Sequence, residues 1–167
     1  STIAGQARSS LAALSAADAT VLPWNPGANG NVRRLETWGG RLFAVGSFTS
    51  AGGAARGGGA AFDLASGAMT PWDPRAGATI EATAFHDSTA FLGGAFHTLA
   101  GQAHSTLAAV DLAAGDARPW MAAPNGNVTA LAVESDGLIV GGEFTAMGTA
   151  TRYRFARLHV QSGAVES

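Results

Sequence analysis

Eight polar side chains lie in segments predicted to be loops, where side chains are free to contact a ligand. Neutral amides are the commonest type, and amides and hydroxyls suit a sugar or a peptide backbone better than a phosphate. The set also includes two carboxylates, an imidazole and a guanidinium. We therefore predict that the loops share a face that binds a protein or carbohydrate ligand. Its candidate residues are Asn29, Asn31, Asp73, Arg75, His97, Asn125, Asn127 and Glu143.

The acidic residues also raise the alternative of an enzyme. A glycoside hydrolase needs two carboxyl groups about 5–10 Å apart, and Asp73, Glu81 and Glu143 are the residues that would supply such a pair. The sequence contains no nucleotide-binding glycine loop, nucleophile elbow or zinc-protease motif. We therefore favour a non-enzymatic scaffold or binding module, with a hydrolase or lyase as the alternative.

No metal site and no cofactor are predicted. The chain has no Cys, so a thiolate ligand is excluded. His97 and His104 flank one loop, seven residues apart, which is not a spacing typical of metal ligands. His86 and Asp87 lie on a hairpin at the opposite end of the same repeat. We interpret these histidines as exposed loop residues.

Composition excludes two further classes of protein. Ten Arg and no Lys stand against twelve Asp and Glu, giving a net charge of −2, whereas nucleic-acid binders carry a clustered basic excess. No apolar run approaches the roughly 18 residues that a membrane-spanning helix needs. The one basic cluster, Arg152, Arg154 and Arg157 with Tyr153, is expected to be a solvated or interface surface. We predict neither nucleic-acid binding nor membrane insertion.

A repeat of 48 residues organises the whole chain. Trp24, Trp72 and Trp120 keep this spacing, and each follows a Pro. Residues that recur in every repeat are expected to be structural, because one binding site needs no copy in each unit. We predict that the arginine column forms an ion pair or a clamp on a backbone carbonyl. The other ungapped columns are Phe48, Phe96 and Phe144; Gly46, Gly94 and Gly142; and Arg8, Arg56, His104 and Arg152.

Each repeat is predicted to contain four short strands separated by turns. Turn dipeptides such as Asp136-Gly137 separate the apolar segments, and no window keeps a helical period. An all-β unit of this length, repeated around an axis, is typical of a β-propeller blade. We therefore predict one repeat domain, a β-propeller segment of about three and a half four-stranded blades, with a β-trefoil as the alternative. The predicted parts of residues 1–167 are an outer half-blade at 1–24 and blades at 31–72, 79–120 and 127–167.

A family resemblance supports this interpretation. One order of a loop, an Arg, a strand ending in Asp and a Trp motif appears in the repeats, in pieces from different copies. The pieces are Gly142-Glu143-Phe144-Thr145, Arg56, Leu107 to Asp111 and Trp72-Asp73-Pro74. This order resembles the Kelch blade and, more closely, the delta-60 repeat family of bacterial β-propellers. The resemblance covers the whole chain and implies a fold rather than a function. It also implies an extracellular or cell-surface location in bacteria.

The number of predicted blades has a consequence for assembly. Propellers typically have four to eight blades, so three and a half cannot close a ring. The open flanks would expose apolar sheet faces, which soluble monomers rarely do. We expect the chain to associate with itself or to be part of a larger propeller chain or assembly. A structural subunit that completes a ring with other chains is therefore a further alternative function.

Overall fold

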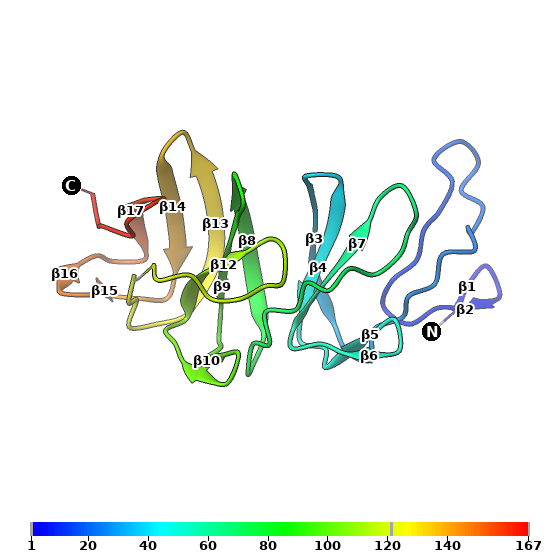
Figure 1. Cartoon of the computed structure of the whole chain (residues 1–167), viewed down its shortest axis with the longest axis horizontal. Coiled ribbons are helices and arrows are strands. Elements are labelled where there is room, and N and C mark those ends of the chain that lie inside the picture. Colours follow the sequence, from blue (N-terminus) through cyan, green and yellow to red (C-terminus); the bar gives the residue numbers. More distant parts are fainter. Residues whose placement is uncertain (1, 121, 167) are drawn as a thin grey trace.

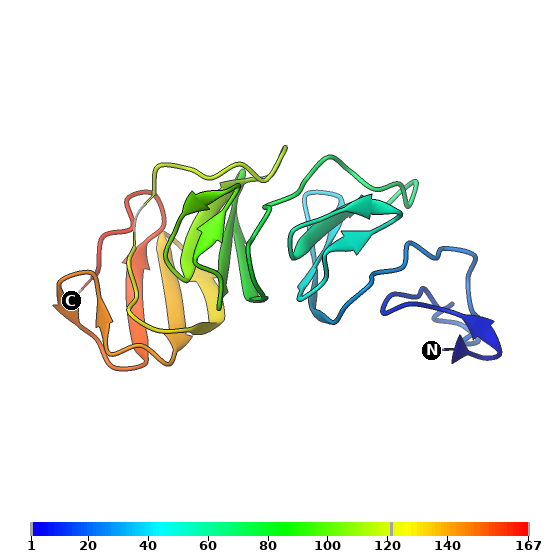
Figure 2. The same ribbon diagram turned by 90° about the horizontal axis from the view of Figure 1, so that it is seen from below.

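The computed structural model describes residues 2–120 and 122–166, and this part of the chain contains short β-strands and no helix. Three three-stranded antiparallel sheets follow one another along the sequence. Figures 1 and 2 show the sheets side by side along the long axis of the molecule. Met121, in the last predicted connecting loop, and the terminal residues Ser1 and Ser167 lie outside the described residues.

The three sheets share one design, in which the second strand of each unit lies in the middle. The first sheet contains β3 (Val32–Trp38), β4 (Arg41–Gly46) and β7 (Gly59–Asp63). The second sheet contains β8 (Ile80–His86), β9 (Thr89–Gly94) and β12 (Leu107–Asp111). The third sheet contains β13 (Val128–Glu134), β14 (Gly137–Gly142) and β17 (Phe155–His159). We call the contact between the first and second sheets the first junction, and that between the second and third sheets the second junction.

Small hairpins precede the last strand of each sheet. They are β5 (Ser50–Ala51) with β6 (Ala54–Ala55), β10 (Thr98–Leu99) with β11 (Gln102–Ala103), and β15 (Ala146–Met147) with β16 (Ala150–Thr151). The N-terminal segment, residues 2–24, has the corresponding hairpin of β1 (Thr2–Ile3) and β2 (Gln6–Ala7) but no three-stranded sheet. The hairpins lie along the lower side of Figure 1.

The row of sheets has two opposite edges, which are formed by different kinds of loops and turns. The loop edge consists of the small hairpins with the linkers 25–31, 73–79 and 122–127. Isolated bridges such as Ala28 to Ala51 and Ala76 to Leu99 connect each linker to a hairpin. The turn edge, on the upper side of Figure 1, carries the tight turns between the first two strands of each sheet. These turns are Gly39-Gly40, Asp87-Ser88 and Ser135-Asp136.

The predicted fourth strand is reduced to a single bridge in each unit. Phe62 pairs with Met69, Val110 with Ala117 and Leu158 with Val165. In the first two of these units a proline follows the bridge, at positions 71 and 119, and its missing N–H group prevents the ladder from continuing. The fourth segment therefore pairs with the edge of each sheet at a single bridge and does not add a fourth strand to it.

The alternative prediction of a β-trefoil is not supported by the structure. A trefoil requires strands from its three units to close into a barrel. In the described part of the chain the sheets remain separate and no barrel closes. The chain is an all-β repeat structure of antiparallel sheets. Among the same residues no helix has the length and apolar character needed to cross a bilayer.

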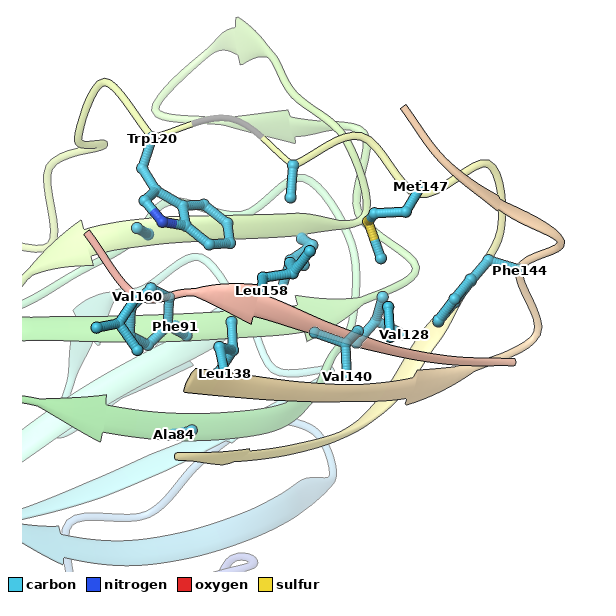
Figure 3. Close-up of a cluster of buried hydrophobic side chains, with 14 residues drawn as sticks. Ala84, Phe91, Trp120, Val128, Leu138, Val140, Phe144, Met147, Leu158 and Val160 are labelled. Atoms are coloured by element: carbon cyan, nitrogen blue, oxygen red, sulfur yellow. The ribbon is translucent and has the colours of Figure 1, made fainter. Parts of the chain in front are cut away.

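The core consists of apolar layers between successive sheets. Because side chains alternate along a strand, Phe91 and Leu107 of the second sheet face the third sheet, whereas Leu92 and Ala108 face the first. All four are at most 1% exposed. Figure 3 shows the layer at the second junction, where Leu138, Val140 and Leu158 join Phe91. A sheet buried on both faces explains why its strands are continuously apolar in the sequence.

The arginine column forms carbonyl clamps, as predicted. The Nη2 group of Arg56 donates to the carbonyl of Thr70 at 3.2 Å, and that of Arg152 donates to the carbonyl of Glu166 at 2.8 Å. Arg8 makes the equivalent bond to Leu22 at 2.9 Å. Each clamp fastens the short fourth segment to the hairpin of its own unit. His104 occupies this position in the second unit.

Trp72 of the tryptophan column contacts the neighbouring sheet. Trp72 is fully buried, and its Nε1–H group donates to the carbonyl of Asp111 at 3.1 Å. Its ring meets Phe43 edge-to-face, with ring centroids 5.0 Å apart. Trp72 therefore contributes to the apolar layer and to the hydrogen bonding of the first junction at once.

Replacing Trp72 by Ala should destabilise the chain by about 3–5 kcal/mol, because the change leaves a cavity and an unpaired carbonyl at Asp111. Urea unfolding followed by circular dichroism measures this loss. Tyr153→Ala is the control, since Tyr153 is 73% exposed and surface substitutions usually change stability by less than about 0.5 kcal/mol. A loss below about 1 kcal/mol for Trp72→Ala would contradict the assigned packing.

The turn after β12 is held by the carboxylate of Asp111. This carboxylate accepts hydrogen bonds from the backbone N–H groups of Ala113 and Ala114 at 2.8 Å and of Asp116 at 2.9 Å. Partial burial raises the pKa of Asp111, but the surrounding backbone donors outweigh that effect, so the pKa lies below its ordinary value. The ionised form is therefore favoured in the folded chain.

This shift predicts a pH-dependent contribution to stability. Because the folded-state pKa of Asp111 is lowered, its contribution is present above the unfolded-state pKa and is lost as pH falls through the folded-state value. Asp111→Asn should unfold at lower urea concentration than the native sequence at neutral pH, and the difference should shrink as the pH falls below the ordinary Asp pKa of 3.8. Asp87→Asn, at an exposed turn, is the control. An equal difference at both pH values would refute the assignment.

Candidate functional site

Four of the eight predicted residues line one groove on the loop edge, at the second junction. The groove has a volume of about 450 Å³ and is lined by His97, Asn125, Asn127 and Glu143, with the hydroxyl residues Ser105 and Thr106 beside them. This volume lies within the range of small-molecule sites, about 300–1,000 Å³. Residues from two units thus meet in one cavity.

Buried phenylalanines anchor the backbone next to the two ionisable groove residues. Phe96 and Phe144 are fully buried, and each is a direct neighbour in sequence of an exposed groove residue, His97 or Glu143. The backbone N–H of Glu143 also donates to the carbonyl of Asn127 at 2.8 Å. The side chains at the rim therefore project from anchored backbone.

The linker that forms one wall of the groove is fastened by hydroxyl groups of the second unit. Ser105 Oγ donates to the carbonyl of Ala122 at 2.8 Å, and Thr106 Oγ1 donates to that of Gly126 at 2.6 Å. A Cβ atom at Gly126 would lie 2.7 Å from the carbonyl oxygen of Glu143. Only glycine fits this approach, so the wall packs tightly against the third unit.

Asn125 has a structural role within the groove. Its amide oxygen accepts from the N–H groups of Thr145 and Ala146 at 2.9 and 3.0 Å, and its amide nitrogen donates to Thr145 Oγ1 at 2.9 Å. Asn29 makes the same three bonds to Thr49 and Ser50, at 2.8–2.9 Å. We call this arrangement the Asn–Thr latch. It connects a linker to the following hairpin.

The second unit lacks this latch, and the loss frees a groove residue. Gly77 and His97 occupy the positions that Asn and Thr take in the other two units. A Cβ atom at Gly77 would lie 2.0 Å from Thr98 Oγ1, so an asparagine there would displace Thr98. The side chains of His97, Asn127 and Glu143 make no hydrogen bond within the described residues. They are the groups available to a ligand.

The other four predicted residues lie outside this groove. Asn29 forms a latch, and Asn31 contributes its carbonyl to the N–H of Ser47 at 2.9 Å. The carboxylate of Asp73 accepts from the N–H groups of Gly57 and Arg75 at 2.9 and 3.0 Å, and the Arg75 side chain pairs with Asp116. Asp73 and Arg75 therefore stabilise the linker at the first junction.

Ser105 and Thr106 are groove residues that the sequence did not predict. The signal that could have found them is a break in the repeat, because the equivalent residues in the preceding unit are Gly57 and Gly58. Glu143 is a break of the same kind, with Ala95 as its counterpart. The second junction thus gathers polar substitutions where the first junction has small residues.

One arginine of the basic cluster predicted near the C-terminal end is ion-paired. Arg157 pairs with Asp136 at 3.2 Å and with Glu166, and Arg152 is the carbonyl clamp of the third unit. No group of three histidine, aspartate or glutamate side chains within residues 2–120 and 122–166 is placed to hold a metal ion. The polar groove is the candidate site that brings the most predicted residues together.

The comparisons with known proteins inform the fold. No family model matches the sequence, and no match was found among curated proteins. The structure is similar to that of the computationally designed protein Ika8, with a TM-score of 0.57 and 15% identity over 83% of this chain and 36% of Ika8. It is also similar to the designed protein Ika4, with a TM-score of 0.55 and 15% identity over 80% of this chain and 69% of Ika4. The chain spans about a third of the length of Ika8, and this likeness concerns the fold alone.

Proposed function

We propose that the chain is a segment of a β-propeller, about three and a half blades long, that acts as a non-enzymatic module binding carbohydrate through the groove of its loop edge. The repeat of similar sheets supports the propeller. The first strands β3, β8 and β13 contact one another in order across both junctions, as the innermost strands of neighbouring blades would. The N-terminal segment is the outer half of a preceding blade.

The chemistry of the groove favours a sugar over a protein as ligand. Asn127 offers a donor and an acceptor, Glu143 accepts hydrogen bonds, and His97 adds a ring nitrogen of either kind. These groups match the paired donors and acceptors of sugar hydroxyls. A stable protein interface buries about 800 Å² on each partner, whereas this groove is the size of a small ligand. Its polar lining at a rigid wall is the observation on which the proposal depends.

The location of the protein is part of the same proposal. The resemblance to the delta-60 repeat family implies a bacterial surface or extracellular protein. A carbohydrate-binding module fits that setting, because polysaccharides are abundant at cell surfaces. A peptide ligand is the alternative outcome of the binding test.

A hydrolase or lyase fits the groove less well. The Asp73 carboxylate is occupied by two backbone N–H groups at the first junction, and Glu143 lines the groove at the second. A lone carboxylate lacks the second group that glycoside hydrolysis requires. The geometry therefore favours binding over catalysis.

The first test is a glycan array probed with the tagged chain, followed by calorimetry on the best saccharide. Glu143→Gln should weaken binding about tenfold or more, because a hydrogen bond to a charged group contributes about 1.5–3 kcal/mol. His97→Ala should also weaken binding. Asn31→Ala is the matched control, since Asn31 is the counterpart of Asn127 in the first unit and should leave the affinity unchanged.

Two results would contradict this function. One is the absence of any retained glycan while a peptide library yields ligands that compete for the groove. The other is saccharide binding that is unaffected by both Glu143→Gln and His97→Ala.

A second candidate function is that of a structural subunit whose blades complete a ring with other chains. Exposed apolar side chains at both ends of the row of sheets favour it. Phe155 is 60% exposed on the outer face of the third sheet, and Leu35 is 53% exposed on β3. The counterpart of Phe155 in the second unit, Leu107, is fully buried against the third sheet.

This candidate predicts that the isolated chain associates. Size-exclusion chromatography with light scattering at micromolar concentration should show a mass above that of the monomer. Phe155→Glu should lower the mass, since a charge opposes burial of the face. Leu64→Glu is the control because Leu64 is equally exposed, at 54%, but lies in a turn. A compact monomer for the unmodified chain would exclude self-association.

A further inference from the structure

A second cavity lies at the other end of the second junction, on the turn edge. It has a volume of about 360 Å³, and its lining combines apolar residues, among them Phe91 and Trp120, with Arg118 and His86. Figure 3 shows Phe91, Trp120 and Val160 at one end of the buried cluster and Phe144 and Met147 at the other. Phe144 is the residue that anchors Glu143 of the groove, so the two cavities are separated by the core.

The first junction has a cavity of similar size at the equivalent place, about 370 Å³, but its polar lining differs. There, Trp38 donates its indole N–H to the carbonyl of Asp87 at 3.1 Å, and Arg41 reaches across to the carbonyl of Leu112. His86 and Thr89 occupy the equivalent positions of the second junction. Both are shorter than the residues they replace, and within the described residues neither side chain donates to a carbonyl across the second junction.

The indole of Trp120 lacks the partner that its counterparts have. Trp24 donates to the carbonyl of Gly67 at 2.9 Å, and Trp72 donates to that of Asp111 at 3.1 Å. Trp120 is only 4% exposed, and its Nε1–H group has no acceptor in the described part of the chain. A buried donor without an acceptor costs about 1–3 kcal/mol, so an acceptor supplied from the cavity would be favoured.

Arg118 adds positive charge and a second donor. It occupies the position of Thr70 in the preceding unit, and its Nη2 group holds the carbonyl and the hydroxyl of Ser88, both at 3.0 Å. These bonds fix the guanidinium at the cavity wall. Its Nε–H group is also buried and unpaired among the described residues. Trp120 and the cationic Arg118 thus line a single cavity, and each carries a buried N–H group without an acceptor among the described residues.

We propose that this cavity binds a small carboxylate with an apolar, aromatic-sized body. The carboxylate oxygens would accept from Arg118 and from the indole of Trp120, because a charged acceptor forms stronger hydrogen bonds than a neutral one. The body would pack against Phe91 and Val160. The lining also includes the exposed carboxylate of Asp87, which contacts His86 at 3.5 Å.

Benzoate is a suitable probe, and the indole N–H signals of the ¹⁵N-labelled full chain report on the site. The four Trp residues give four such signals, and the spectrum of Trp120→Phe identifies the one from Trp120. During titration to about 10 mM, the Trp120 signal should shift to saturation while that of Trp72 stays in place. Benzyl alcohol, which lacks the charge, should bind at least about tenfold more weakly.

Two variants test the location. Arg118→Gln should weaken benzoate binding at least about tenfold, whereas Arg75→Gln, at the first junction, should not. An unchanged Trp72 signal in both variants shows that the fold is intact.

The proposal is overturned if the Trp120 signal does not move, if benzyl alcohol binds as well as benzoate, or if the Arg118→Gln variant keeps the native affinity. None of these results bears on glycan binding at the loop edge, so the two sites are tested independently.

Discussion

The structure depends on the stacking of its sheets, which buries both faces of the second sheet. Phe91 and Leu107 need the third sheet to cover them, and Leu92 and Ala108 need the first. Removing apolar surface from water is the main favourable contribution to folding, at about 25 cal/mol per Å². A single unit therefore cannot hide its apolar residues alone, and stability comes from stacking one sheet on the next. The same requirement leaves residues such as Phe155 exposed wherever no further sheet follows.

Recurring polar contacts hold the stacked units in one geometry. Arginine clamps close the units of Arg8, Arg56 and Arg152, and the Asn–Thr latch secures the linkers of two units. The indoles of Trp24 and Trp72 donate to carbonyls of the following unit. These contacts involve backbone carbonyls and N–H groups, so they hardly constrain the neighbouring side chains. The loops can therefore vary in sequence without a change in their backbone. The turn at Ala19 is an example, because its φ of +59° is close to the +71° of Gly67 at the equivalent position.

The two candidate sites lie where the repeat is broken. At the second junction, His97 and Glu143 replace residues that are small or latched elsewhere, and a polar groove results. On the opposite edge, His86 and Thr89 replace larger residues, and the cavity there is lined by Trp120 and Arg118, which carry unpaired buried donors. The third sheet shows another kind of break, since Arg157 pairs with Asp136 and Glu166 where the second sheet has Ala109. One scaffold thus carries different surfaces at positions that are equivalent in the repeat.

The amino-acid sequence by itself determined the all-β class, the 48-residue unit and the residues that recur, because periodic spacing directly reflects repeated local structure. It also predicted the clamp of Arg56, since a cation present in every unit needs a partner in every unit. It did not separate the latched Asn125 from the available Asn127, nor did it show that Asp73 binds backbone N–H groups. Only the tertiary structure decided which predicted residues share a groove. That outcome depends on contacts between units, such as Thr106 with Gly126, and sequence spacing within a unit carries no information about them.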